Sequence, residues 1–279
     1  MKNYILYNPL SANGKNADML KALEEKIGEH ELKSVLDLDD KIGFLKSLDA
    51  TDRIYLIGGD GTINKFANGI KGYTLVNEVY YCAGGTGNDF ITDEKAKSKD
   101  GLILLNPYLK HLPTLYVNDE ELLFINGVGY GLDGYCCSLG LEQAKKSPKP
   151  VNYTAIAIKL LLFKYKRRNA KITVDGVTKT YKRVWLAPTM LGRFYGGGMM
   201  VTPNQMRDSG KVSCGIMYGS GKLKTLMVFP SIFKGEHVLH KEMFEVLEGK
   251  DILVEFDRPT DLQVDGEVFY NVTKYRVKA

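Results

Sequence analysis

The stretch Gly58-Gly59-Asp60-Gly61-Thr62 places one carboxylate among three glycines. Glycine lets a backbone approach a phosphate closely, and a helix that begins there offers N–H groups and the positive end of its dipole. A carboxylate beside bound phosphates is tolerated when a cation lies between them, so Asp60 is predicted to be a metal ligand for a Mg²⁺-nucleotide. The alternative is a tight strand-to-helix turn that needs glycine for its backbone alone.

Two more polar turns that contain glycine follow apolar stretches. Gly85-Thr86-Gly87-Asn88-Asp89 comes after Val79–Ala83, and the segment from Asn8 to Lys15 comes after Tyr4–Tyr7. If these stretches are strands of one parallel sheet, their carboxyl ends meet at one edge, and the three turns converge there. Three converging turns favour phosphate binding over a purely conformational need for glycine.

The stretch Asp265-Gly266-Glu267 carries two carboxylates late in the chain. A turn of this kind can project a general base that takes the proton from an attacking hydroxyl, which typically accelerates a reaction ~10²–10⁴-fold. The sequence does not decide between Asp265 and Glu267 as the base. An Asp-Gly hairpin turn followed by an incidental glutamate is the structural alternative.

Two patterns of secondary structure divide the chain. In the first part, short apolar stretches alternate with helical patterns such as Ile63, Phe66, Ala67 and Ile70, and this alternation predicts a parallel sheet. From about residue 114 the pattern changes to short β-rich runs separated by turns, which favours an antiparallel sandwich. The predicted strands there span residues 115–117, 122–126, 171–174, 181–186, 212–218, 252–256 and 270–277, and one helix spans residues 152–166. We therefore predict an α/β nucleotide-binding domain over residues 1–115 and an antiparallel β-sandwich domain over residues 116–279.

Composition excludes several classes of protein. The 279 residues are 44% hydrophobic and 25% charged, which is typical of folded domains and excludes disorder. The four cysteines form no C-x-x-C pair, and no apolar run approaches the ~18 residues of a membrane span. Without a recognisable signal peptide, the chain is expected to be cytoplasmic. His237 and His240 are expected at the surface and Trp185 in the core.

Charge is distributed unevenly along the chain. The segment from Lys145 to Arg183 contains twelve basic residues and one acidic residue, for a net +11, whereas the rest of the chain has a net −6. Such a segment indicates an anionic partner, although a solvated surface is the simpler interpretation. The predicted helix over residues 152–166 is apolar nearly all round and leads into Lys164, Lys166, Arg167 and Arg168. Burial between domains is one interpretation of this helix, and docking on an anionic membrane is the other.

Five motifs occur in a characteristic order over nearly the whole chain. They are GGDGT at residues 58–62, GTGNDF at 85–90, FINGVGYGLD at 124–133, GGGM at 196–199 with TPN at 202–204, and DGE at 265–267. This ordered set resembles the diacylglycerol kinase catalytic-domain family, which includes bacterial lipid kinases and the sphingosine and ceramide kinases. GGDGT alone is shared with NAD kinases.

The resemblance implies an active site in a cleft between a nucleotide-binding domain and a β-sandwich, with ATP and Mg²⁺ as cofactors. It implies that Asp265 or Glu267 is the base, that Asp60 lies near the metal, and that Asn126 and Asp133 shape the cleft. The residues predicted to bind the cofactor are Asn8, Lys15, Gly58, Gly59, Asp60, Gly61, Thr62, Asn64, Gly85, Thr86, Gly87, Asn88 and Asp89.

The expected function is therefore an ATP-dependent lipid kinase that phosphorylates a lipid hydroxyl, that of diacylglycerol before others. The alternatives are another lipid acceptor such as a sphingoid base, a NAD kinase-like phosphotransferase, and a nucleotide-binding regulator without catalysis. Absence of a T-P-T-G-S-type segment counts against NAD kinase, and the DGE motif counts against the regulator. The expected partner is a lipid substrate at an anionic membrane surface, reached by peripheral association, and not a nucleic acid. A homodimer is one assembly to test.

Overall fold

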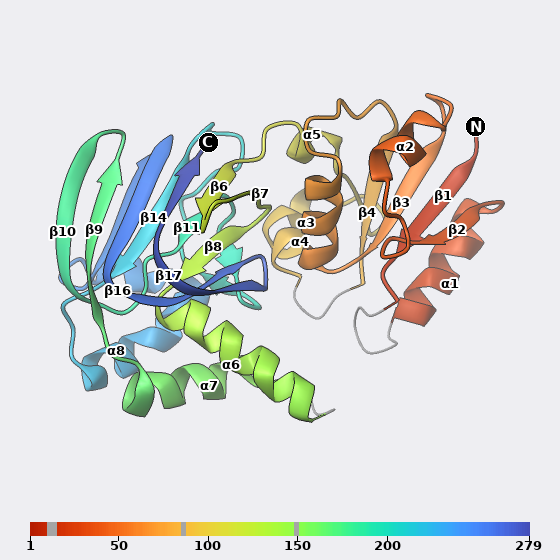
Figure 1. The fold of residues 1–279 in the computed structure, drawn as a ribbon. Coiled ribbons are helices and arrows are strands. Elements are labelled where there is room, and N and C mark those ends of the chain that lie inside the picture. Colours follow the sequence, from red (N-terminus) through yellow and green to blue (C-terminus); the bar gives the residue numbers. More distant parts are fainter. Residues whose placement is uncertain (10–15, 85–87, 148–150) are drawn as a thin grey trace. The chain divides into compact units, whose positions relative to one another are not determined.

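The computed structural model describes residues 1–9, 16–84, 88–147 and 151–279 (Figure 1). It divides into two compact units, Met1–Leu112 and Pro113–Ala279, whereas the sequence placed the boundary between residues 115 and 116. Lys15, Gly85, Thr86 and Gly87, which were predicted to bind the nucleotide, lie outside the described residues.

The N-terminal unit is a sheet with helices on its connections. Its strands are β1 (Asn3–Tyr7), β2 (Glu31–Ser34), β3 (Arg53–Gly58), β4 (Glu78–Ala83) and β5 (Leu102–Leu104). Its helices are α1 (Asn16–Ile27), α2 (Lys41–Lys46), α3 (Asp60–Gly69), α4 (Asp89–Glu94) and α5 (Asn106–Leu109), with a 3₁₀ turn η2 (Lys95–Lys97) after α4. The strand order is β2-β1-β3-β4-β5; the first four strands are parallel and β5 is antiparallel to β4. The predicted parallel sheet is thus confirmed, with an antiparallel edge strand added.

The order of the strands creates a switch point next to β1. The chain leaves β1 to form β2 on one side and then returns to form β3 on the other side. At such a point the connections diverge and leave a crevice at the carboxyl ends of the two strands, where α/β proteins bind ligands. Buried Ile54, Leu56 and Ile57 make β3 apolar on both faces, as expected for a central parallel strand.

The C-terminal unit is built from antiparallel strands. The first of these are β6 (Thr114–Val117), β7 (Glu120–Leu123), β8 (Gly127–Tyr130), β9 (Arg168–Val174) and β10 (Val177–Val184). Next come β11 (Thr189–Met190), β12 (Phe194–Tyr195), β13 (Met199–Met200), β14 (Val212–Met217), β15 (Phe244–Gly249), β16 (Asp251–Val264) and β17 (Glu267–Lys278). The helical segments are α6 (Leu132–Lys146), α7 (Tyr153–Lys159), a π turn η3 (Leu160–Lys164), α8 (Lys222–Val228), and the 3₁₀ segments η4 (Phe229–Lys234) and η5 (Glu236–Leu239).

The long strand β16 organises this unit. Its first half pairs with β9 and its last residues pair with β8, while β17 runs along its other side. The β16–β17 register shifts between Glu255 and Leu262, and bulges of this kind bend a strand. One strand can therefore serve both ends of a folded sheet. The predicted fold class, α/β followed by an antiparallel β-sandwich, is confirmed.

Some sequence predictions for this unit were wrong. The 15-residue helix α6 was not predicted, because its glycines and cysteines give no strong helical period. His237, predicted at the surface, is fully buried against Phe244, with its Nε2 2.9 Å from the carbonyl oxygen of Val201. Trp185 is fully buried, as predicted. Among the described residues, no helix is both long and apolar enough to cross a membrane.

Candidate functional site

Asn8 connects the turn that follows β1 to the turn that follows β3 through hydrogen bonds. It follows β1, and its backbone N–H donates to the carbonyl of Ile57 at the end of β3 (3.2 Å). Its side-chain amide donates to Oγ1 of Thr62, also at 3.2 Å. The residues after β1 and β3 are therefore held together at the switch point of the sheet.

Asp60 connects the turn that follows β3 to the turn that follows β4 through hydrogen bonds. Its side chain is only 8% exposed. One carboxylate oxygen accepts a hydrogen bond from the backbone N–H of Asp89 (2.9 Å), and the other accepts one from the N–H of Phe90 (3.2 Å). Asp60 thus caps the first turn of α4, whose own N-cap residue, Asn88, makes no side-chain cap. The described parts of the three predicted turns form one connected cluster.

Helix α3 begins inside this cluster. Gly59 is its N-cap residue and supplies no side-chain cap, and Asp60 is its first residue. The N-terminal N–H groups of a helix are a natural site for a phosphate. At Gly58, packing alone explains why the residue is glycine, because a Cβ there would collide with the side chain of Thr62.

Two asparagines complete the described part of the cluster. Asn64 is 6% exposed and its Oδ1 accepts a hydrogen bond from Asn68 (3.1 Å). The Oδ1 of Asn88 is buried and has no hydrogen-bond partner among the described residues. A buried amide oxygen of this kind is suited to accept from a ligand or to contact a hard cation.

The Asp265-Gly266 turn connects β16 to β17. Val264 pairs with Glu267, and both turn residues have positive φ, +45° for Asp265 and +99° for Gly266. This is the two-residue hairpin that favours an Asp-Gly sequence, so the structural alternative is correct for the backbone.

The side chain of Asp265 has a structural role. One of its oxygens accepts from the N–H of Ile125 (2.6 Å), and the other accepts from the N–H groups of Asn126 (2.9 Å) and Gly127 (3.1 Å). Arg207 holds the same segment from another direction, since its guanidinium donates to the carbonyl of Ile125 and to Oδ1 of Asn126. The sequence did not identify Arg207, because more than 80 residues separate it from its partners.

Glu267 differs from Asp265. It is the first residue of β17 and its side chain is exposed. Beneath the turn, Gln263 accepts a hydrogen bond from the N–H of Gly266 (2.8 Å) and so fixes the backbone that leads to Glu267. The turn is rigidly supported, and of its two carboxylates Glu267 is the one that lies at the surface.

Asp133 stands at the start of α6, close to the same strands. The Tyr195 hydroxyl donates to its Oδ2 (2.9 Å), and a Cβ on Gly129 would lie 2.7 Å from Oδ2 and 2.6 Å from the Gln263 amide nitrogen. Burial raises the pKa of Asp133 to about 6, against the hydrogen bond from Tyr195, which lowers it. Asp133 and Gln263 thus lie close to each other beside β8.

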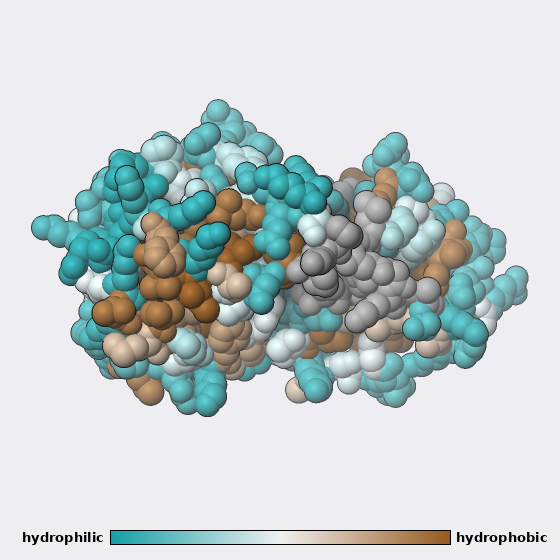
Figure 2. All heavy atoms as spheres, turned by 90° about the horizontal axis from the view of Figure 1, so that it is seen from below, coloured by the Kyte–Doolittle hydropathy of each residue, from teal (hydrophilic) through white to brown (hydrophobic). Residues whose placement is uncertain are grey.

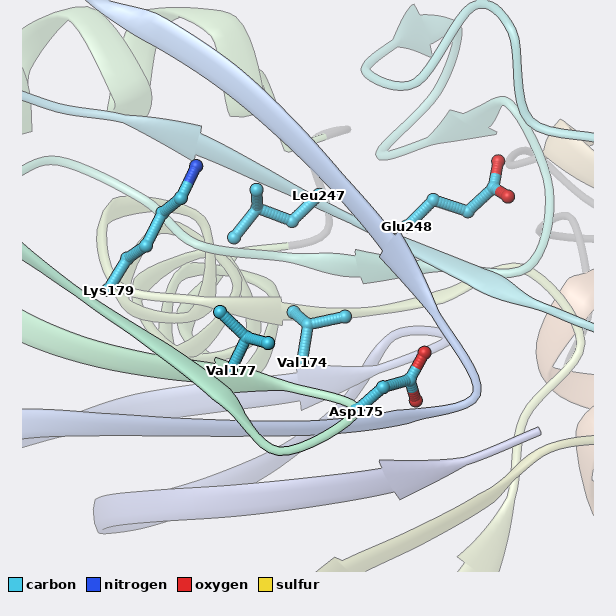
Figure 3. A pocket seen from close by; sticks show the side chains of 6 residues that line it. All are labelled: Val174, Asp175, Val177, Lys179, Leu247 and Glu248. Atoms are coloured by element: carbon cyan, nitrogen blue, oxygen red, sulfur yellow. The ribbon is translucent and has the colours of Figure 1, made fainter.

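The described residues include no group of three His, Cys, Asp or Glu side chains that could hold a metal ion. A hollow of about 220 Å³ lies between the β9–β10 hairpin and β15 (Figure 3). It is lined by Val174, Asp175, Val177, Lys179, Leu247 and Glu248, none of which was predicted to bind a ligand. The carboxylate of Asp175 in this hollow accepts hydrogen bonds from the backbone N–H groups of Lys250 and Asp251. These bonds give Asp175 a structural role.

Comparison with known proteins decides the family. Residues 2–106 match the diacylglycerol kinase catalytic domain. Residues 127–276, more than half of the chain, match the YegS C-terminal NAD kinase beta sandwich-like domain. The chain belongs to the diacylglycerol kinase catalytic-domain family. As a member of this lipid kinase family it is a phosphotransferase with an alcohol group as acceptor, and ATP is the phosphate donor that the family implies.

Individual relatives agree with this assignment. A Mycobacterium tuberculosis (strain H37Rv) protein named diacylglycerol kinase is 24% identical over 227 residues, which are 78% of this chain and 71% of that protein. A solved structure of a diacylglycerol kinase from Bacillus anthracis str. Sterne matches with a TM-score of 0.67 and 20% identity, over 99% of this chain and 93% of that one. The structural match shows the shared fold.

Proposed function

We propose that this lipid kinase transfers the γ-phosphoryl group of ATP to the free hydroxyl of diacylglycerol and so forms phosphatidic acid. The observation that carries the proposal is the cluster at the carboxyl ends of β1 and β3, where Asn8 binds Thr62 and Asp60 binds the start of α4. The choice of acceptor is supported by relatives that are named diacylglycerol kinase.

In the proposed site the N-terminal unit binds the nucleotide. The backbone N–H groups at the start of α3 hold phosphate oxygens, because they lie at the positive end of the helix dipole. Asn8 orients the Thr62 hydroxyl, and Asp60 sets the position of α4 relative to α3. Alignment and charge neutralisation by such groups provide most of the catalysis in phosphoryl transfer.

The residues present fit a bound Mg²⁺. Mg²⁺ usually takes one or two protein carboxylates together with phosphate oxygens and water, and it prefers hard oxygen ligands. Asp60 supplies a carboxylate in the cluster, and the buried Oδ1 of Asn88 supplies a further oxygen without a partner among the described residues. When bound, Mg²⁺ would neutralise charge on the phosphates.

Glu267 is the proposed general base. It is exposed and can accept the proton of the lipid hydroxyl as the phosphoryl group is transferred. The carboxylate of Asp265 accepts three backbone N–H groups and holds the turn that carries Glu267. In this proposal Asp265 is a positioning residue.

Phosphorylation of an acceptor panel tests the proposal. The protein is incubated with γ-labelled ATP and Mg²⁺, and with diacylglycerol, sphingosine or NAD as acceptor. Label in phosphatidic acid that exceeds label in the other products at least tenfold would support the proposal. Preferential labelling of sphingosine or of NAD would replace diacylglycerol by that acceptor.

A further inference from the structure

An apolar face covers one side of the C-terminal unit. We define it by Ile158, Phe163, Leu223 and Met227, of which the last three are 77%, 74% and 74% exposed. Ile158 belongs to α7, Phe163 to η3, and Leu223 and Met227 to α8. Figure 2 looks toward the side where α6, α7 and α8 lie, and it shows brown side chains gathered over this part of the unit with teal ones around them.

The exposure of this face is a consequence of how its helices are built. In the π turn η3, Leu160 and Leu161 are buried in the core with Val228 and Ile232, while Phe163 projects outward. The turn closes through the N–H of Tyr165, which donates to the carbonyl of Leu160 (2.8 Å). Lys222 then donates from α8 to the carbonyl of Leu162 (2.7 Å), so the two halves of the face are joined.

The charged side chains on the helical segments of this face are all basic, and one of them, Lys224, is ion-paired with Glu242 beyond these segments (2.8 Å). The segments Tyr153–Lys164 and Lys222–Lys234 contain Lys159, Lys164, Lys222, Lys224 and Lys234 and no acidic residue. A second copy of this chain, related by a twofold axis, would place these lysines against each other. An anionic surface with an apolar interior complements both the lysines and the apolar side chains. We propose that the apolar face is the membrane-docking surface of this protein and that it inserts Phe163, Leu223 and Met227 at the headgroup level of an anionic bilayer.

The proposal changes the docking residues that the sequence indicated. Arg167 stacks on Trp185, with 5.1 Å from the guanidinium carbon to the ring centroid, and it donates to the carbonyl of Ser220 (2.6 Å). Arg168 lies over the ring of Tyr165 and donates to the carbonyls of Lys166 and Pro259. Both guanidinium groups are bound to the protein. Of the basic residues that the sequence indicated, Lys164 is therefore kept beside the membrane, and Lys159 of α7 is added.

The docking face is connected to the proposed catalytic turn through α6. Tyr153 at the start of α7 packs against Gly140 of α6 so closely that a Cβ there would collide with its ring. In the same way, Gly134 of α6 packs against the backbone of Asp261 in β16, and Ser138 donates to the Asp261 carboxylate (2.6 Å). A bilayer bound at α7 and α8 therefore has a packed connection to the strand that leads to Glu267. In calling the bilayer the source of substrate, this inference rests on the proposed function.

Co-sedimentation with vesicles in the absence of ATP tests the docking surface. The probes are vesicles of equal parts phosphatidylglycerol and phosphatidylcholine, and vesicles of phosphatidylcholine alone. One variant is Phe163→Gln/Leu223→Gln/Met227→Gln, and its control is Val177→Gln, a side chain that is 68% exposed on β10. A second variant is Lys159→Gln/Lys164→Gln, and its control is Lys171→Gln/Lys182→Gln in the β9–β10 hairpin of the same basic segment. Thermal unfolding establishes that each variant is folded.

We expect the wild type to prefer anionic vesicles. Both docking variants should bind these vesicles at least about tenfold more weakly. For the lysine variant, the reason is that each lysine near such a surface raises the binding constant about fivefold. Both controls should stay within about twofold of the wild type, and high salt should weaken binding. Wild-type binding by the triple variant, or an equal loss in the hairpin control, would overturn the proposal. So would a change in self-association of the triple variant, seen by sedimentation velocity, with vesicle binding unchanged.

Activity separates this inference from the proposed function. Diacylglycerol dispersed in detergent micelles should be phosphorylated equally by wild type and both docking variants, because none of the replaced residues belongs to the proposed catalytic cluster. A protein that binds vesicles but phosphorylates no lipid would contradict the proposed function alone. A protein that is active on micelles but does not bind vesicles would contradict the docking surface alone.

Discussion

The carboxylate of Asp60 accepts a hydrogen bond at 2.9 Å from the backbone N–H of Asp89, 29 residues later in the chain. One side chain in the turn after β3 therefore caps the helix that follows β4. The sequence predicted a carboxylate that faces bound phosphates, and the structure shows a side chain that is also a structural part of the sheet edge. The two contributions of Asp60 can be separated by substitution.

Asp60→Asn should lower turnover and leave most of the stability intact, because the amide keeps one accepting oxygen but loses the charge. Loss of a preorganised electrostatic group typically costs about 10²–10³-fold in kcat. Asp60→Ala should in addition lose about 1–3 kcal/mol of the free energy of unfolding, because the buried N–H groups of Asp89 and Phe90 lose the carboxylate to which they donate. Steady-state rates and thermal unfolding of the two variants check this. An asparagine variant with wild-type kcat would contradict the catalytic part.

Glu267→Gln and Asp265→Asn should have different effects. Glu267→Gln should lower kcat about 10²–10⁴-fold and change stability by less than Asp265→Asn does, because the side chain is exposed and the substitution keeps its size while removing its basicity. Asp265→Asn retains a residue that tolerates positive φ but has one accepting oxygen fewer, and should destabilise the protein by about 1–3 kcal/mol. If Asp265→Asn is as stable as the wild type and Glu267→Gln is fully active, both assignments fail.

His237 should make stability sensitive to acid. Burial lowers its pKa from 6.5 to about 4, so the unfolded chain binds a proton that the folded protein does not. Stability contributed by the neutral ring is present above pH 6.5 and is lost as the pH falls through 4, by about 3 kcal/mol in all. Denaturant unfolding from pH 7 to pH 4 measures this loss. His237→Gln should flatten the pH profile, and His240→Gln, at a partly exposed position, should not.

Asp133 should have the opposite effect on the pH dependence of stability from that of His237. Its pKa is raised from 3.8 to about 6, so ionisation of this half-buried carboxyl destabilises the folded state above pH 6, and stability is regained as the pH falls from 6 to 3.8. Asp133→Asn keeps an oxygen for the Tyr195 hydroxyl and should be more stable than the wild type at pH 8 by up to about 3 kcal/mol. The difference should shrink at pH 4. The exposed Asp39→Asn should change stability by less than about 0.5 kcal/mol at either pH; equal stabilisation by both variants would contradict the assignment.

The sequence by itself determined the parts that depend on local patterns. Apolar stretches such as Ile54–Ile57, each followed by a polar turn with glycine, predicted the parallel sheet. The spacing of Ile63, Phe66 and Ala67 predicted α3, because an amphipathic helix repeats its buried positions every three to four residues. The Asp265-Gly266 pair predicted a hairpin, since that turn requires positive φ at both positions.

Tertiary structure alone decided what several side chains do. Asp265 and Glu267 could not be told apart in the sequence, because the N–H groups that occupy Asp265 lie about 140 residues earlier. His237 is buried and Phe163 is exposed for the same reason: which side of a short helical turn faces the core depends on the strands and helices packed against it. Local pattern sets the elements and their turns, whereas burial and hydrogen-bond partners are set by segments that are distant in the chain and close in the fold.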